Sequence, residues 1–417
     1  MKTKYYKITL LLFTVLAMNA CNTFNDAADA EKVEPLTINL KMDFAIQGLA
    51  DYSKMKVTLN NYDEGLVIEK PFEPNMSIGG LIPGIYDVLV SGRANDQTGE
   101  SFLISGSLEK KAILIDGEEF VITVDGVQVK PLIFSEIYYC GSKTPSGTNW
   151  FRDQFYEIYN NFYDVLYLDG IYFAQLFPTN ATQTLPLWPE ADGNKYVYAA
   201  NIWKIPGNGT DYPLAPGESF VISQFAANHQ LEIYNPASPV NCFPSEFEFN
   251  MNNQNFPDQP AYDMIHVFNN GKADMVGIQY LTPVFGSVYV IFRVPQGEVY
   301  DPVNNLNLQT RNLAGTSATL YGKIPISYVL DGVEAADNEQ MGQYKRMPAI
   351  LDAGFVTVGD TYIGQSVARK CIGQNPDGTP ILQDTNNSTE DFDRNLVPKF
   401  RRYGSKMPSW NHTLINK

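Results

Sequence analysis

Histidine and cysteine are scarce in this sequence of 417 residues, and their scarcity excludes several kinds of active site. The three histidines, His229, His266 and His412, stand far apart, with no second histidine or cysteine at the spacing of a zinc site. Four cysteines occur and none form a CxxC pair, so a disulfide framework is excluded. One bridge is permitted in an oxidising compartment, and Cys140 with Cys371 is the first pair to test.

Signatures of nucleophilic and nucleotide chemistry are also missing. The sequence has no G-x-S-x-G elbow, no P-loop and no G-x-G-x-x-G. The two carboxylates of a glycosidase can lie anywhere in a sequence, so a glycan- or peptide-cleaving enzyme stays as the least favoured alternative. We predict a protein that is not an enzyme and that carries no cofactor.

One acidic segment, DTNNSTEDFD at 384–393, has side-chain oxygens that recur along it as they do in a calcium-binding loop. An EF-hand loop needs glycine at its sixth position and a bidentate glutamate at its twelfth, where this chain has Thr389 and Asn395. We interpret the segment as a polar turn and predict no metal site.

Positive charge is scarce as well, with 30 basic against 46 acidic residues and a net charge of −16. A chain this acidic repels phosphates, and no basic patch with interleaved aromatic residues offsets that, so we expect no nucleic-acid partner. The exception is the C-terminal segment 396–417, which holds Lys399, Arg401, Arg402 and Lys406. Either these side chains are solvated or they dock against an acidic partner.

The apolar run from Ile8 to Ala17 follows three lysines and is too short for a permanent span of about 20 apolar residues. It predicts a signal peptide over 1–20. Removing that segment leaves 27 basic against 46 acidic residues, a net charge of −19.

The end of the leader, Met18-Asn19-Ala20-Cys21, resembles the bacterial lipobox. The resemblance implies that Cys21 receives lipid, and several acyl chains hold a protein to a membrane almost permanently. Residues 21–34, rich in Ala, Asp and Glu, then form a tether. We expect the protein at the outer membrane, lipid-anchored, on the cell surface.

Residues 35–128 show short alternating strands separated by Gly, Asp and Asn, which is typical of an antiparallel sandwich. Leu81–Val90 has the pattern L-x-P-G-x-Y-x-V-x-V, with Tyr86, Val88 and Val90 on one face. This resembles the transthyretin-like and Ig-like modules of secreted bacterial proteins, which implies a spacer.

Residues 129–395 contain a succession of short motifs in a set order. They are FSEIYY, QFYEIYNN, VLYLDGIYF, LAPGESFVIS, YVLDGVE, GQSVAR and DTNNSTEDF. The order resembles the lamin-tail domain, an Ig-like β-sandwich, with long insertions at about 176–212 and 231–323. The resemblance therefore implies an all-β protein of two tandem Ig-like sandwiches.

The whole arrangement is also similar to a family of Bacteroidota lipoproteins catalogued as a domain of unknown function. Members tend to be encoded beside TonB-dependent outer-membrane receptors. The resemblance implies a receptor barrel as a partner, in addition to the membrane.

A carboxylate stands in an aromatic row within QFYEIYNN, where Glu157 shares a face with Phe155 and Tyr159. A catalytic role would need a matched second acid. In the lamin-tail pattern this Glu is a framework residue, because a carboxylate can accept backbone N–H groups or an arginine fork. We predict a structural acceptor, with Arg369 as its partner.

The two insertions mix aromatic residues with amides, a combination that stacks on sugar rings or grips a partner's loops. Trp188, Trp203, Phe256 and Tyr262 are the candidate ligand-binding residues, for a glycan or a peptide. Ordinary core filling explains the same residues.

Two functions remain. The first is a lipid-anchored binding or accessory subunit of a TonB-dependent uptake system, with the first sandwich as spacer and the insertions as contact surface. The alternative is a structural or adhesive envelope protein that transports nothing. Fold alone does not decide between them.

Overall fold

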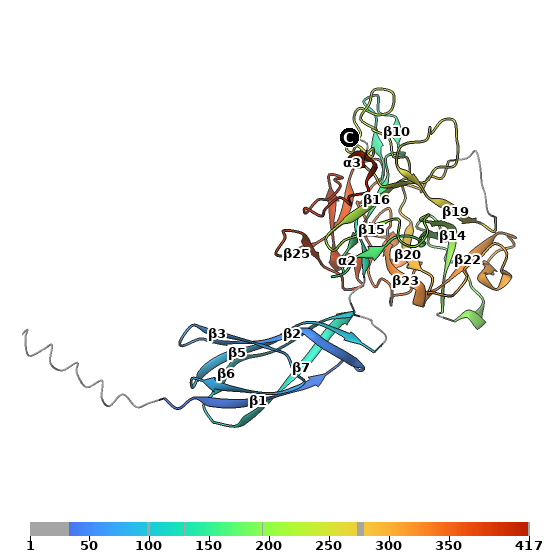
Figure 1. Ribbon diagram of the computed structural model, residues 1–417. Coiled ribbons are helices and arrows are strands. Elements are labelled where there is room, and N and C mark those ends of the chain that lie inside the picture. The colour runs from blue at the N-terminus through green and yellow to red at the C-terminus, as the bar shows by residue number, and fades with distance from the viewer. Residues whose placement is uncertain (1–32, 98–100, 129–130, 194, 273–278, 416–417) are drawn as a thin grey trace, which may run out of the picture. The chain divides into compact units, whose positions relative to one another are not determined.

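The computed structural model describes residues 33–97, 101–128, 131–193, 195–272 and 279–415, coloured along the chain in Figure 1. The leader, Cys21 and most of the predicted tether lie outside these residues. The chain divides into two compact units, 1–128 and 129–417. Within the described ranges, no helix is long and apolar enough to cross a membrane.

The first unit is built from seven strands. They are β1 (Leu36–Phe44), β2 (Leu49–Asn61), β3 (Leu66–Pro71), β4 (Asn75–Leu81), β5 (Gly84–Asp96), β6 (Ser101–Ile113) and β7 (Glu118–Gln128). Their order is β3-β2-β5-β6-β7-β1-β4. The first half of β7 pairs parallel with β1 and its last residues pair with β6, so β7 joins the two halves of the sheet.

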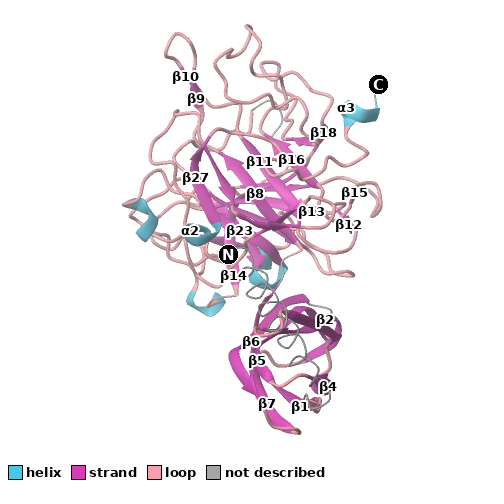
Figure 2. Cartoon of the chain, turned by 90° about the vertical axis from the view of Figure 1, so that its left-hand side faces the viewer, coloured by secondary structure: helices cyan, strands magenta, loops and turns pink. Residues whose placement is uncertain are grey.

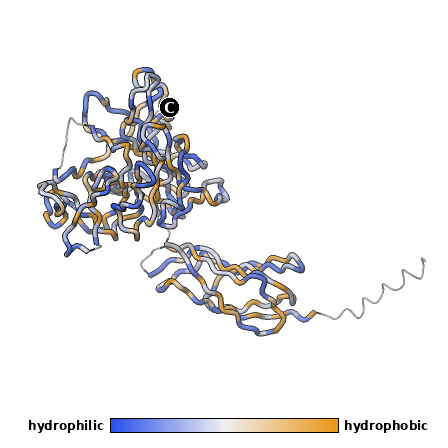
Figure 3. Tube along the Cα trace, turned by 180° about the vertical axis from the view of Figure 1, so that it is seen from behind, coloured by the Kyte–Doolittle hydropathy of each residue, from blue (hydrophilic) through white to orange (hydrophobic). Residues whose placement is uncertain are grey.

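Alternation along these strands forms one core. On β5, Tyr86, Val88 and Val90 are fully buried, while Ile85 and Leu89 on the other face are exposed. The Tyr86 hydroxyl donates to the carbonyl of Ile82 at 2.7 Å, which fixes the Pro-Gly turn before the strand. Figure 3 colours the chain by residue hydropathy, and orange and blue segments are interspersed along it. The face predicted from the L-x-P-G-x-Y-x-V-x-V pattern is the buried one.

The second unit contains a seven-stranded sheet that we call the carboxylate sheet. Its order is β18-β17-β16-β11-β8-β24-β27. The strands are β8 (Leu132–Tyr138), β11 (Phe155–Asn160), β16 (Ser219–Ser223), β17 (Phe247–Glu248), β18 (Tyr262–Asp263), β24 (Ser366–Arg369) and β27 (Phe392–Leu396).

The facing sheet, which we call the apolar sheet, has the order β21-β22-β14-β13-β20-β23, with β19 paired to β14. Its strands are β13 (Ile171–Leu176), β14 (Tyr196–Lys204), β19 (Ile265–Asn269), β20 (Val288–Arg293), β21 (Gln309–Arg311), β22 (Leu320–Pro325) and β23 (Val329–Glu334).

Small elements complete the described part of the second unit. Three two-stranded ribbons join β9 (Ser142–Lys143) to β10 (Asn149–Trp150), β12 (Leu166–Tyr167) to β15 (Pro213–Leu214), and β25 (Cys371–Gln374) to β26 (Pro380–Leu382). Short helices are η2 (Glu190–Asp192), η3 (Leu306–Leu308), η4 (Ile326–Tyr328), η5 (Met341–Gln343), α2 (Ser388–Asp391) and α3 (His412–Ile415).

The main core of the second unit lies between its two sheets. Tyr156 of β11 contacts Phe173 of β13 and Tyr289 of β20, with ring centres 4.7 Å apart in both pairs. Trp203 of β14 is fully buried in the same core. The protein is therefore all-β and sandwich-like, as the sequence predicts.

Both ranges expected as insertions, whose fold the sequence left open, supply strands to the sandwich. β14 lies within 176–212, and β20, within 231–323, pairs with both β13 and β23. The reason is burial on both faces, because a second core covers the outer side of these strands. Segments such as VYVIFR are apolar without alternation for this reason.

Candidate functional site

The carboxylate in the aromatic row is covered by the chain's own C-terminal segment. We call residues 397–411 the C-terminal strap. Glu157 is 1% exposed and accepts hydrogen bonds from the backbone N–H of Arg401 at 2.8 Å and the hydroxyl of Ser405 at 3.2 Å. On the same face, Phe400 packs edge-on against Phe155, with ring centres 4.7 Å apart. Glu157 is thus a structural acceptor.

Two more buried carboxylates hold the strap. Glu136, opposite Glu157 in the register of β8 and β11, accepts Nε of Arg402 at 2.9 Å and Nη2 at 2.7 Å. Glu246 accepts Nη2 of Arg401 at 2.6 Å and the N–H of Val221 at 2.8 Å. Burial raises the pKa of both Glu136 and Glu246, although the arginines oppose that shift.

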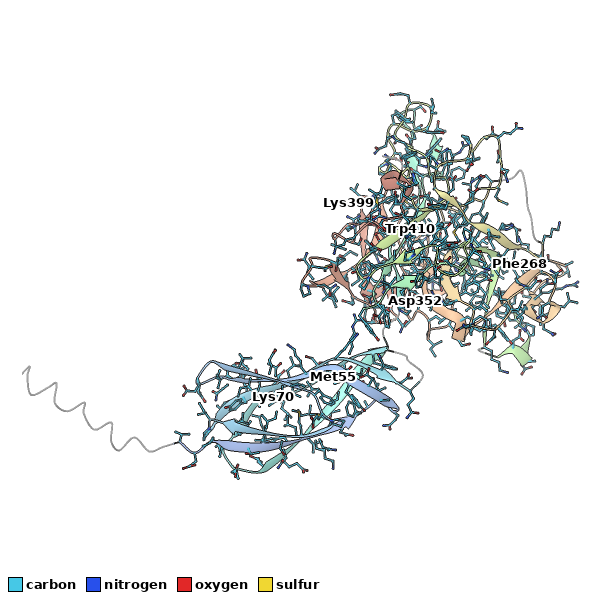
Figure 4. The ribbon with its side chains drawn as sticks, viewed as in Figure 1. Met55, Lys70, Phe268, Asp352, Lys399 and Trp410 are labelled. Carbon is cyan, nitrogen blue, oxygen red and sulfur yellow. The ribbon has the colours of Figure 1, made fainter. Side chains whose placement is uncertain are left out.

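These contacts leave no room for a substrate between the two facing acids. The void lined by Glu136, Glu157, Arg402 and Ser405 measures about 10 Å³, no more than one water molecule needs. Figure 4 labels Lys399 and Trp410, which lie towards the two ends of the strap. Arg401 and Arg402 were considered for docking on an acidic partner. Instead, they bind the buried carboxylates beneath the strap.

Arg369 does not pair with Glu157, which corrects the predicted partnership. Its Nη2 lies 2.9 Å from Asp331, and its Nη1 lies 3.1 Å from Asp384 and 3.3 Å from Asp391. The cause is the order of the strands in the sheet. Arg369 lies on β24 beside β8, whereas Glu157 lies on β11 on the other side of β8. The segment interpreted as a polar turn thus supplies two of the acids around this arginine.

The four aromatic residues predicted to bind a ligand do not come together. Trp203 is a core residue with no exposed surface. Trp188 stacks on Tyr198 with ring centres 3.9 Å apart, and the Tyr262 hydroxyl donates to the carbonyl of Trp410 at 3.4 Å. These three are packing residues, as the core-filling alternative expects. Phe256, 9% exposed, packs against Arg152, which lines a groove.

That groove lies between the β9–β10 hairpin and the loop that follows His229, and we call it the hairpin groove. Its volume is about 550 Å³, within the range of ligand pockets. Figure 2 shows β9 and β10 at one end of the second unit, beyond the ends of β11 and β16. Its lining consists of Thr144, Pro145, Ser146, Thr148, Asn149, Trp150, Phe151, Arg152, Glu232, Tyr234 and Pro236.

The hairpin wall is shaped by backbone constraints. Gly141 has a φ of 70°, and a Cβ there would lie 2.5 Å from the carbonyl oxygen of Trp150. At the tip, the N–H of Thr144 donates to the carbonyl of Thr148 at 2.9 Å, and Gly147 makes the turn with a φ of 83°. The hydroxyls of Thr144, Ser146 and Thr148 consequently form a row.

Arg152 is the cation of the groove, and it is held in place by rings. Its guanidinium carbon lies 4.4 Å from the ring centre of Phe256 and 5.2 Å from that of Trp150. In the described part of the chain, no carboxylate lies within 4.0 Å of this guanidinium and no group accepts its hydrogen bonds. Burial lowers the pKa of Arg152. By contrast, Arg346, Arg369, Arg394, Arg401 and Arg402 all have carboxylate partners.

The two walls of the groove meet at Asp153, a carboxylate with no exposed surface. Asp153 accepts hydrogen bonds from Ser142 of β9 at 3.0 Å and from Ser238 of the opposite loop at 2.7 Å. The loop is also joined to the hairpin by Asn235, whose amide donates to the Ser142 hydroxyl at 3.1 Å. Asp153 therefore positions the walls, and Arg152 is its neighbour in sequence.

Burial also raises the pKa of Asp153 to about 6, although Ser238, Ser142 and Tyr138 donate to it. A carboxyl whose folded-state pKa lies above its unfolded value stabilises the fold fully below pH of about 4 and loses that contribution as the pH rises through about 6. The expected slope is at most about 1.4 kcal/mol per pH unit.

The measurement is urea unfolding of the wild type and of Asp153→Asn between pH 4 and 7. Tryptophan fluorescence reports the second unit alone, because all four tryptophans lie at position 150 or later. We expect the variant to lose stability less steeply than the wild type over this range. Parallel curves would show that Asp153 titrates with an ordinary pKa.

A second polar cluster is formed by Glu248, Asp258 and Asp263, whose ligand oxygens lie within 4.8 Å of one another. Both oxygens of Glu248 already accept backbone N–H groups, from Ala226 and Gln259, each at 2.9 Å. Burial, with the charges of the two aspartates, raises the pKa of Glu248 to about 7. The three carboxylates could accept a divalent cation, but the donors around Glu248 serve it without one.

The described cysteines are free thiols, so the pair considered for a bridge is not formed. Cys140 donates to the carbonyl of Gln365 at 3.1 Å, and Cys371 packs beside Ile133 and Leu382. Burial raises the pKa of Cys140 to about 11, which makes it a weak nucleophile at neutral pH.

The hairpin groove is not among the sites predicted from the sequence. The available signal was the spacing of Trp150 and Arg152, which an extended chain places on one face after the turn signal PSGT. Nothing in the sequence reveals that Phe256, more than a hundred residues later, closes over the same arginine.

Fold and groove together define an all-β, two-unit protein with a candidate ligand groove on its second unit. A family model described as "Protein of unknown function (DUF4876)" matches residues 215–399. The crystal structure of a DUF4876 family protein from Bacteroides thetaiotaomicron is 54% identical, covers 91% of this chain and 100% of that chain, and has a TM-score of 0.75. The chain therefore belongs to the DUF4876 family. Comparison with the curated proteins gives no match.

Proposed function

We propose that this protein is a lipid-anchored binding protein of the outer membrane that presents the hairpin groove to a ligand. The observation that carries the proposal is Arg152, a half-buried cation without a carboxylate partner among the described residues, in contact with two rings in a groove of about 550 Å³. In an acidic chain whose other half-buried arginines are mostly paired, such a group is best explained by a ligand from outside.

The cellular setting of the proposal comes from the leader. A short apolar run followed by Ala20-Cys21 supports lipid attachment at Cys21. The resemblance to lipoproteins encoded beside TonB-dependent receptors supports a receptor barrel as the partner. We take the first unit as a spacer and the second as the binding unit.

Co-isolation tests this proposal. Full-length protein is isolated by an affinity tag from outer membranes in mild detergent, with Cys21→Ser as the matched control. We expect a barrel protein to be recovered with the wild type, and the variant to appear in the soluble fraction. Recovery of the wild type from membranes without any barrel would favour the alternative, a structural or adhesive envelope protein.

We also propose that the second unit is a lamin-tail-like Ig domain. All seven motifs behind that resemblance lie on or beside strands, from FSEIYY on β8 to DTNNSTEDF before β27. Superposing an experimental structure of this chain on lamin-tail domains tests the idea. A different strand order in the matched sheets would refute it.

A further inference from the structure

The chemistry of the hairpin groove narrows the class of ligand. The groove is lined by short hydroxyl side chains on the hairpin, an amide at Asn149, three aromatic side chains at Trp150, Phe151 and Tyr234, one arginine and one glutamate, with two prolines. Hydroxyls and amides that both donate and accept, beside aromatic faces, suit a ring that carries hydroxyl groups.

Arg152 adds a requirement for negative charge. The rings of Phe256 and Trp150 lie against the guanidinium, and no group among the described residues accepts hydrogen bonds from its N–H edge. A planar carboxylate accepts two parallel hydrogen bonds from that edge. Pre-orientation by Phe256 and Trp150 reduces the entropy lost on binding.

The number of charges is limited as well. Arg152 is the one cation in the groove lining, which also contains Glu232, and the protein carries a net charge of −16. A densely charged polyanion would meet repulsion that a single arginine does not offset. One carboxylate on an otherwise neutral ligand interacts mainly with the arginine, because charges farther away than the Debye length of about 8 Å are largely screened.

We infer that the hairpin groove binds a carbohydrate bearing a single carboxylate, with the acid on Arg152 and a sugar ring against Trp150 or Tyr234. The inference rests on the proposed function, since it names the ligand class of the same groove. It also separates the roles of two adjacent residues: Asp153 positions the walls, and Arg152 contacts the ligand.

Isothermal titration calorimetry on the full chain in detergent tests the inference with matched probes. The acidic probes are 3′-sialyllactose and glucuronosyl-xylobiose, and their neutral counterparts are lactose and xylotriose. A capped acidic peptide, N-acetyl-Ala-Glu-Ala-amide, is the third class. We expect at least one acidic sugar to bind at least about tenfold more tightly than its neutral counterpart and than the peptide.

Variants assign the charge to Arg152. Arg152→Gln should weaken binding of the acidic sugar by about 10- to 100-fold and leave the neutral sugar unchanged, while Arg152→Lys should retain part of the affinity. Arg311→Gln, an exposed position on β21 outside the groove, makes the same change in net charge and should have no effect. Thr148→Val tests the hydroxyl row without altering charge.

Each other result overturns the inference. Equal affinity for acidic and neutral sugars would remove the role of Arg152, and preference for the peptide would assign the groove to protein partners. Absence of binding by every sugar at millimolar concentration would also refute it. None of these results affects co-isolation with a barrel, so failure of the ligand class and failure of the proposed function are distinguishable.

Discussion

Replacing Arg369 by methionine is expected to lower the free energy of unfolding of the second unit by about 3–5 kcal/mol at pH 8. The guanidinium lies beside three carboxylates, those of Asp331, Asp384 and Asp391, and also donates to the carbonyl of Phe134 at 2.9 Å. Methionine fills similar space, but it leaves three buried acids without a cation. Burial is the main cost of keeping such groups charged.

The loss should depend on pH in a defined direction. Burial, against the charge of Arg369, raises the pKa of Asp331 to about 7, and removing the cation raises it further. An acid with a raised folded-state pKa stabilises the fold at low pH and loses that contribution as the pH rises. We therefore expect the destabilisation to be smaller at pH 5 than at pH 8.

The measurement is urea unfolding at both pH values, followed by tryptophan fluorescence. The control is Arg394→Met on the neighbouring strand β27, which removes a pair with the exposed Glu339 and should cost about 0–1 kcal/mol. Equal effects of the two substitutions would contradict the structural role of the Arg369 cluster.

Replacing Arg402 by methionine is expected to cost about 2–4 kcal/mol at pH 8, because it leaves Glu136 buried and short of its fork partner. The strap would retain its contacts at Glu157 and Glu246, so we expect destabilisation and not complete detachment. Arg402 is 18% exposed, which places the cost below that for Arg369.

A double-mutant cycle isolates this pair. Glu136→Gln together with Arg402→Met should recover part of the loss, since a neutral amide is less costly to bury than an unpaired carboxylate. The matched control is Lys406→Met in the same strap, which breaks the exposed pair of Lys406 with Asp377. This substitution should change stability by less than about 1 kcal/mol. Additive single effects would show that Glu136 and Arg402 do not interact.

Local sequence patterns were sufficient for the strands and for the role of one carboxylate. Alternation placed Tyr86, Val88 and Val90 on a buried face, and the lamin-tail pattern, with no matched second acid, implied that Glu157 is a framework residue. The first conclusion depends on residues within a few positions of each other, where a period of two determines which side chains share a face.

Partners distant in the sequence were not predictable in the same way. Arg369 was assigned to Glu157 because both suit an acid–base pair, but the sheet order places β8 between their strands. Arg401 reaches Glu246 across 155 positions of the sequence, and Arg152 meets Phe256 across more than a hundred. Such pairings depend on sheet order and strap path, which single-sequence patterns do not specify.

Burial on two faces explains why the strands in the two insertions were not predicted. Continuous apolar stretches such as VYVIFR have no alternation, so they do not match the pattern of a strand in a sheet with one exposed face. The second core over the apolar sheet makes them central strands. Trp203 belongs to the main core between the two sheets, and Trp188 packs against the small cluster of Tyr198 and Tyr321.

A crystal structure of the chain bound to 3′-sialyllactose is the most direct test. It shows whether the hairpin groove holds the sugar and whether the buried acids only support the fold. The account predicts the ligand in the hairpin groove, with its carboxylate on the guanidinium edge of Arg152. A sugar lodged between Glu136 and Glu157 beneath a displaced strap, above all one with its glycosidic bond cleaved, would contradict it.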